Sequence, residues 1–189
     1  MIQNYLQSVK KQFLFAKTLG DQCFDQLSDD DLFWRHSPEN NSIAVIVNHL
    51  NGNMLSRWTD FLTSDGEKKW RQRDQEFEEI ITSRAQLISK WEEGWKVLFT
   101  ALESINEENY NEKIYIRNQG HTITEAINRQ LGHYSYHIGQ IVFIAKMRSG
   151  EKWNSLSIPK GKSSAYNANK FAKEKHTAHF SDEFTKKEK

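Results

Sequence analysis

The chain has 189 residues, 37% of them hydrophobic and 12% aromatic, which suits a folded domain and argues against intrinsic disorder. Its formal net charge of +1 excludes the overall basic field that drives nucleic-acid binding, and its one cysteine excludes an internal disulfide. No apolar run approaches the ~20 residues of a membrane span, so we expect a cytoplasmic protein with neither nucleic acid nor membrane as a partner.

Apolar residues recur at helical spacing over residues 2–27, which predicts a first amphipathic helix. Cys23 belongs to this apolar stripe, so we interpret it as a buried small hydrophobe rather than a nucleophile. A charged, proline-containing segment then breaks the pattern. The second helix is expected to begin at Asn41 or Ser42, both good N-caps, and to continue to about Leu62.

A long polar connection follows the second helix over residues 63–77. Connections longer than ~12–15 residues are usually functional or disordered. Trp70 and Phe77 interrupt the polar sequence, and two large aromatic side chains favour a loop that packs against the protein. We therefore predict an ordered crossover rather than a flexible linker.

The third predicted helix begins at Ser83, where Ser83 and Gln86 match a capping box, and apolar residues follow at heptad spacing. Ile114 and Ile116 then alternate with polar residues, and an Asn-Gln-Gly stretch follows at residues 118–120. This pattern predicts a short strand and a turn before the next helix.

The fourth predicted helix opens with a capping box formed by Thr122 and Glu125 and ends before Gly150. Four long helices joined by one long crossover connection predict an all-α fold, a four-helix bundle with a minor short strand or hairpin. We assign the bundle domain to residues 1–160. Residues 161–189 form a charged C-terminal extension that we expect to be partly ordered or disordered.

The fourth helix carries His133 and His137 four residues apart, a spacing that places both imidazoles on one face with Cβ atoms about 5–6 Å apart. Two such imidazoles can bind one metal ion at roughly 2.0–2.1 Å. His49 lies in the middle of the second helix beside its apolar stripe, and facing helices of a bundle can bring it to the pair. These three histidines are the predicted metal ligands; the alternative is that they are hydrogen-bonded core residues.

The remaining histidines are excluded as primary ligands. His121 precedes His133 by a distance of roughly 18 Å along a helix. His36 lies in the loop before the second helix, while His176 and His179 lie in the charged tail without a helix to orient them.

The stretch HYSYHIGQI, which contains His133, His137 and Gln140, resembles the His-x3-His-x-Gly-Gln signature of the DinB-like (YfiT-type) metalloenzyme superfamily. In that superfamily a third histidine comes from the second helix, and SIAVIVNHL places His49 at the matching position. The resemblance covers roughly residues 1–150, and the runs RWTDFLTSDGEKKWRQRDQEF and LSIPKGKSSAYN resemble a branch without an assigned function. It implies a DinB-like four-helix bundle, a divalent metal cofactor such as zinc or nickel, and a homodimer.

Characterised members of that superfamily include transferases and isomerases that use low-molecular-weight thiols. The resemblance therefore implies a small-molecule substrate, above all such a thiol, and a transferase reaction on small electrophiles in stress or detoxification. The catalytic group is unassigned, because zinc on three imidazoles activates either a bound water or a bound thiol. Asn53, one turn beyond His49, and Gln140, one turn beyond His137, are candidates for supporting a ligand or contacting substrate.

Two alternatives stay open from the sequence. A non-catalytic, metal-stabilised interaction protein would need the metal only for stability. A metal-dependent hydrolase would need a carboxylate, but no Asp or Glu neighbours the histidines on the fourth helix, so one would have to come from another helix or a loop. Arg57, Arg71 and Arg73 are candidate contacts for an anionic thiol, although solvated surface charge is the simpler interpretation.

Overall fold

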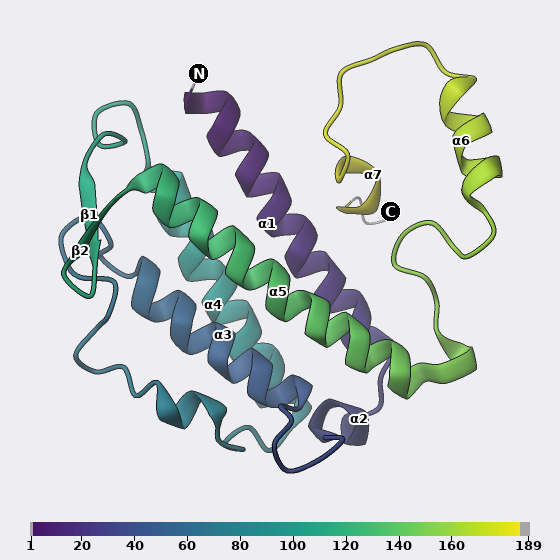
Figure 1. Cartoon of the computed structure of the whole chain (residues 1–189), viewed down its shortest axis with the longest axis horizontal. Helices are drawn as coiled ribbons and strands as arrows, with labels where there is room; N and C mark the ends of the chain where they lie inside the picture. Colours follow the sequence, from purple (N-terminus) through teal and green to yellow (C-terminus); the bar gives the residue numbers. More distant parts are fainter. Residues whose placement is uncertain (1, 186–189) are drawn as a thin grey trace.

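Four long helices lie side by side in the computed structural model, which describes residues 2–185 (Figure 1). The all-α prediction is confirmed, and the strands of the described range form one small antiparallel hairpin. None of these helices is long and apolar enough to cross a membrane. In chain order the elements are α1 (Ile2–Asp25), α2 (Asp29–Phe33), α3 (Ile43–Trp58), the 3-10 helix η1 (Asp74–Phe77), α4 (Arg84–Ser104), β1 (Lys113–Ile116), β2 (Gln119–Thr122), α5 (Ile123–Ser149), the 3-10 helix η2 (Gly150–Lys152), α6 (Ser163–Phe171) and α7 (Asp182–Thr185).

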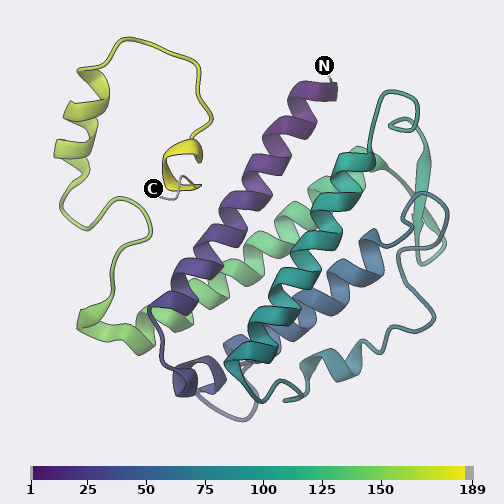
Figure 2. The same cartoon turned by 180° about the vertical axis from the view of Figure 1, so that it is seen from behind.

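The long helices α1, α3, α4 and α5 form a bundle in which each packs mainly against two neighbours. Both α1 and α3 contact α4 and α5. Figures 1 and 2 show that α1 and α5 run in one direction and α3 and α4 in the other. Because α3 and α4 are parallel, the chain has to return along the outside of the bundle between them. Residues 59–83, which include η1, make this return, and they contain the long crossover that the sequence predicts.

Side-chain caps begin the helices where the sequence predicts them. The Ser42 hydroxyl accepts a backbone hydrogen bond at the start of α3, and the predicted capping box at the start of α5 is present. The Ser83 hydroxyl also caps α4. However, Gln86 accepts its hydrogen bond from the backbone of Thr82 rather than of Ser83, so the capping box predicted for α4 is only half formed.

Two helix boundaries differ from expectation. The short helix α2 forms inside the charged segment that breaks the helical pattern, because Ser28 and Asp31 make a capping box there. Helix α3 ends at Trp58 rather than near Leu62. The first difference arises from local capping and the second from the extended backbone of Thr59, and hydrophobic periodicity reports neither.

The hairpin turn lies one residue earlier than predicted. Arg117 and Asn118 occupy the two turn positions, with φ of 57° and 59°, as a two-residue hairpin of type I′ requires. Gly120 instead lies within β2. The carboxylate of Asp65 accepts hydrogen bonds from the backbone N–H groups of Arg117 and Asn118, which attaches the hairpin to the crossover near the end of α3.

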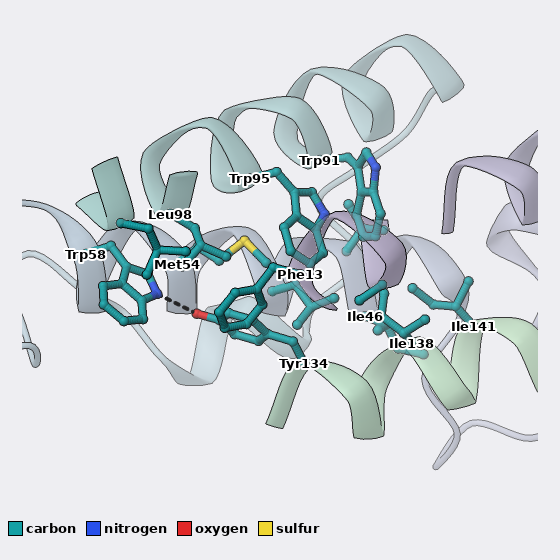
Figure 3. Close-up of a cluster of buried hydrophobic side chains, with 14 of the residues drawn as sticks. Phe13, Ile46, Met54, Trp58, Trp91, Trp95, Leu98, Tyr134, Ile138 and Ile141 are labelled. Carbon is teal, nitrogen blue, oxygen red and sulfur yellow. Dashed lines mark hydrogen bonds between the residues drawn. The ribbon is translucent and has the colours of Figure 1, made fainter. Parts of the chain in front are cut away.

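Aromatic and aliphatic side chains together fill the centre of the bundle (Figure 3). The Trp58 indole donates a hydrogen bond of 3.0 Å to the hydroxyl of Tyr134, which is fully buried. Tyr134 packs against Phe13 and Trp95, so the core joins all four long helices. Cys23 is also fully buried, and burial raises the pKa of its thiol to about 12, which confirms its interpretation as a small hydrophobe.

The C-terminal extension contains α6 and α7. It leaves the bundle after η2 and returns beside α1, as both cartoons show (Figures 1 and 2). Lys11 on α1 forms an ion pair of 2.7 Å with Asp182, and the ring of Phe15 packs against Phe180. Residues 186–189 of the predicted extension lie outside the described range.

Candidate metal centre

Three histidines from two helices converge inside the bundle. His49 lies in the middle of α3, and His133 and His137 lie one turn apart on α5. The Nε2 atom of His133 is 3.3 Å from Nε2 of His49 and 3.2 Å from Nε2 of His137. Within residues 2–185 these side chains are the one group of His, Cys, Asp or Glu that can hold a metal ion, with all ligand atoms within 4.8 Å of one another.

The positions of the imidazole protons suit a bound cation better than a network of hydrogen bonds among the three rings. Nδ1 of His49 lies 2.9 Å from the Glu76 carboxylate, and Nδ1 of His137 lies 2.9 Å from Oε1 of Gln140. Both partners accept hydrogen bonds, so we assign the proton of each ring to Nδ1, which leaves a lone pair on each Nε2. His133 has one Nε2 proton at most and cannot satisfy both contacts.

The nitrogen spacings also agree with a metal site. Two ligand nitrogens at 2.0–2.1 Å from a tetrahedral zinc ion lie about 3.3–3.4 Å apart. The two Nε2 separations of 3.3 Å and 3.2 Å are close to this value. The residues present therefore fit a divalent ion, with three neutral imidazoles as its donors.

A carboxylate from the crossover orients the His49 ring. Glu76 in η1 is buried, and besides His49 it binds Arg71, whose Nε lies 2.7 Å from Oε1 and whose Nη2 lies 2.9 Å from Oε2. The ring of Phe77 stacks on His49 with centroids 4.6 Å apart. A carboxylate behind a ligating imidazole fixes its tautomer and orientation. Glu76 supplies this support from a segment distant in sequence.

The two supporting candidates from the sequence occupy different positions. Gln140 lies beside His137 and accepts the hydrogen bond from its Nδ1. Asn53 lines the cavity next to the histidines, but its Oδ1 accepts a hydrogen bond of 3.1 Å from Tyr134 rather than from a histidine. Gln140 is thus placed to orient a ligand, whereas Asn53 is a cavity wall held by the core.

Burial keeps the α5 histidines neutral. Burial, followed by the neighbouring imidazoles of His137 and His49, lowers the pKa of His133 to about 3. Burial and His49 lower the pKa of His137 to about 4. Burial by itself raises the pKa of Glu76, but the hydrogen bonds from Arg71 and His49 outweigh it and hold that pKa below its ordinary value. Neutral imidazoles are the form that binds a metal.

A cavity of about 380 Å³ adjoins the histidines. Its walls include all three histidine side chains and five arginines, and no Asp or Glu. The other histidines lie elsewhere: His121 is on β2, His36 lines a separate cavity on the far side of Gln140, and His176 and His179 belong to the C-terminal extension.

Several residues of the site escape sequence reasoning. Glu76 and Arg71 lie in a polar loop, where no periodicity marks a residue as buried. Arg57 is only 7% exposed and the Arg71 side chain only 2%, so their interpretation as solvated surface charge is wrong; Arg73 is exposed as that interpretation requires. The packing predicted for Trp70 is also wrong, since it is 56% exposed.

These features define a helical bundle with a three-histidine site, two of whose side chains are buried and one partly buried, that can hold a metal ion. The chain belongs to the family described as "Protein of unknown function (DUF1572)", whose sequence profile matches residues 1–162. That range includes all three histidines and the whole crossover. A search of curated proteins and a search of solved structures each found no match.

Proposed function

We propose that this protein is a divalent-metal-dependent enzyme of the DinB-like superfamily that transfers a low-molecular-weight thiol to small electrophiles. The observation that carries the proposal is the convergence of His49, His133 and His137 next to an open cavity. The family match supports it as well, because it covers the histidines and the bundle together. Zinc and nickel are the metals that we propose first.

A divalent ion held by the three imidazoles would supply Lewis acidity, which lowers the pKa of a thiol or water in the cavity. The protein's own residues then have defined tasks. Glu76 and Gln140 hold the Nδ1 protons of His49 and His137, so both rings keep their Nε2 atoms directed toward His133. In the transfer, sulfur attacks an electrophilic carbon, the carbon–sulfur bond forms, and the leaving group takes its electron pair while the thiol proton passes to solvent.

The surroundings favour an enzyme over a metal-stabilised interaction protein. A structural zinc site fills its fourth position with a protein ligand, whereas a catalytic site leaves it open. The group of candidate ligands in the described range contains three histidines and no fourth donor, and the cavity gives access to it.

The same surroundings argue against a hydrolase. A hydrolase needs a carboxylate free to move a proton at the site. Glu76, in the crossover, is a carboxylate that contacts a histidine of the site. However, it already accepts hydrogen bonds from His49 and from two nitrogens of Arg71. Thiol transfer makes no such demand, because the thiol brings its own nucleophile.

Metal analysis of the purified full chain, followed by thiol-conjugation assays, tests the proposal. We expect one divalent ion per chain, loss of that ion in His137→Ala, and retention in His121→Ala, which changes a histidine outside the cluster. Unchanged metal content in His137→Ala would refute the site. Background conjugation with every common low-molecular-weight thiol would refute the transferase reaction while leaving the site standing.

The homodimer that the resemblance implies is also part of the proposal. Light scattering coupled to size-exclusion chromatography measures it directly, and a monomeric mass would refute it.

A further inference from the structure

The cavity beside the histidines is strongly cationic. Five arginines line it, Arg57, Arg71, Arg73, Arg117 and Arg129, against no Asp or Glu in its walls. The chain as a whole carries a formal net charge of only +1, so this concentration of positive charge is local. Positive charge gathered in a concave, partly desolvated site attracts anions.

Two glutamates behind the wall compensate only part of this charge. Oε2 of Glu67 lies 3.0 Å from Arg57, 3.1 Å from Arg71 and 3.2 Å from Arg117, so three guanidinium groups share one oxygen. Glu76 is already bound to Arg71 and His49. Arg73 and Arg129 are both exposed, and neither has an acidic partner within ion-pair distance among residues 2–185. Five arginines therefore face two glutamates.

Buried polar atoms in the same wall lack partners. Arg57 is 7% exposed, and its Nε has no hydrogen-bond acceptor within the described residues. Gln130 is 2% exposed, and its Oε1 also has no partner there, but this acceptor needs a donor and therefore does not itself favour an anion. Burial and the neighbouring Arg71 also lower the pKa of Arg57. A buried donor without an acceptor is costly, and the unpaired Arg57 Nε–H adds uncompensated positive charge to the wall of the cavity.

The arginines and histidines are arranged in two parallel rows. On α3, His49, Asn53 and Arg57 recur every four residues, and on α5 Arg129 precedes His133 by four. Residues four apart share one helix face. Arg57 lies in the last turn of α3, and Arg129 lies near the start of α5. Figure 1 shows that these two helix ends adjoin the hairpin, whose turn contains Arg117.

This arrangement sets an approximate length for a ligand. At a rise of 1.5 Å per residue, the arginine backbones lie about 6–12 Å along the bundle from the histidines. A cavity of about 380 Å³ suits a small molecule rather than a polymer.

We infer that the arginine end of this cavity, formed by Arg57, Arg117 and Arg129, binds an oxyanion group, so the substrate is a small molecule with a carboxylate or phosphate several atoms from its reacting group. Guanidinium groups suit both oxyanions, because their fork of N–H donors matches two oxygens at once. The inference deepens the proposed function and rests on it for the identity of the reacting group as a thiol; anion binding itself does not.

A calorimetric comparison of matched thiols on the zinc-loaded full chain tests the inference. The probes are 6-mercaptohexanoate, whose sulfur and carboxylate are several bonds apart, and the neutral 6-mercaptohexanol. We expect the carboxylate to improve Kd by roughly tenfold. Arg129→Gln should remove most of this gain without changing zinc affinity. Arg117→Asn, a residue type that tolerates the positive φ of that turn, should act in the same direction.

Lys146→Gln serves as the matched control, because it removes an exposed cation from α5 outside the cavity. The Lys146→Gln variant should keep the full improvement in Kd that the carboxylate gives. When both thiols bind, an improvement in Kd from the carboxylate that survives in Arg129→Gln overturns the inference, and so does an improvement below twofold unless Arg129→Gln abolishes a thermal shift with inorganic phosphate.

A second measurement separates this failure from failure of the thiol reaction. Thermal shifts of the metal-free full chain with inorganic phosphate and with hexanoate report anion binding alone. A shift that Arg129→Gln abolishes supports the inference even when neither thiol binds, and the larger of the two shifts identifies phosphate or carboxylate. If neither thiol binds and neither anion shifts the melting temperature, the inference is wrong.

Discussion

The substitution Glu76→Gln isolates the contribution of the crossover to the metal centre. Gln keeps the size of the side chain but removes the negative charge that faces Nδ1 of His49 at 2.9 Å and the guanidinium of Arg71 at 2.7 Å. Loss of a carboxylate behind a ligating imidazole typically costs 10–100-fold in metal affinity, or about 1.4–2.7 kcal/mol. We expect the Kd for zinc to rise by that factor.

The same substitution should also destabilise the fold. Removing one partner of a buried ion pair costs about 3–5 kcal/mol. Arg71 keeps its contact with Glu67 at 3.1 Å, so the lower end of the range, about 3 kcal/mol, is expected for the loss in free energy of unfolding.

Competition titration against a zinc-binding dye measures the first effect, and urea denaturation of the metal-free chain measures the second. Glu78→Gln is the control, since Glu78 is an exposed acid at the end of the same 3-10 helix. The reasoning is refuted if Glu76→Gln folds and binds zinc within twofold of the wild type, because Glu76 would then not act on the metal site through His49.

Three further predictions concern the same part of the molecule. Gly52→Ala should weaken zinc binding by roughly tenfold, since its Cβ would lie 2.5 Å from the Glu76 carboxylate and displace it; an unchanged zinc Kd by dye competition would contradict this. Tyr134→Phe should lower the free energy of unfolding by about 1–3 kcal/mol in urea titrations, because the buried indole N–H of Trp58 and the amide of Asn53 lose their partner, whereas no loss would mean that neither bond stabilises the core. The metal-free chain should lose stability as pH falls from about 6.5 toward 4, since burial lowers the pKa values of the two α5 histidines from 6.5 to about 3 and about 4, and the unfolded chain therefore binds protons first. Urea denaturation at intervals across this range measures the slope, and a slope of the opposite sign would show that the imidazoles accept protons more readily in the folded chain.

The sequence by itself determined the elements whose signals are local. Helical periodicity and N-caps located the four long helices, because both depend on residues within one or two turns. The row of His133 and His137 follows from helix geometry alone, and the apolar stripe of α3 placed His49 at the edge of the buried face. The helices that carry the three histidines could therefore be predicted from the sequence without knowledge of the tertiary structure.

Only the tertiary structure decided what surrounds those histidines. Glu76 and Arg71 come from an irregular crossover, and nothing in a polar loop sequence shows which residues turn inward. Arg57 follows the same row as His49, yet it is paired with Glu67, a residue of the irregular segment that follows α3. Charged residues are buried only where a partner desolvates with them, and whether Glu67 and Glu76 turn inward depends on how the irregular crossover packs against α3. For this reason the sequence predicted the imidazoles but took Arg57 and Arg71, two buried arginines of the cavity wall, for solvated surface charge.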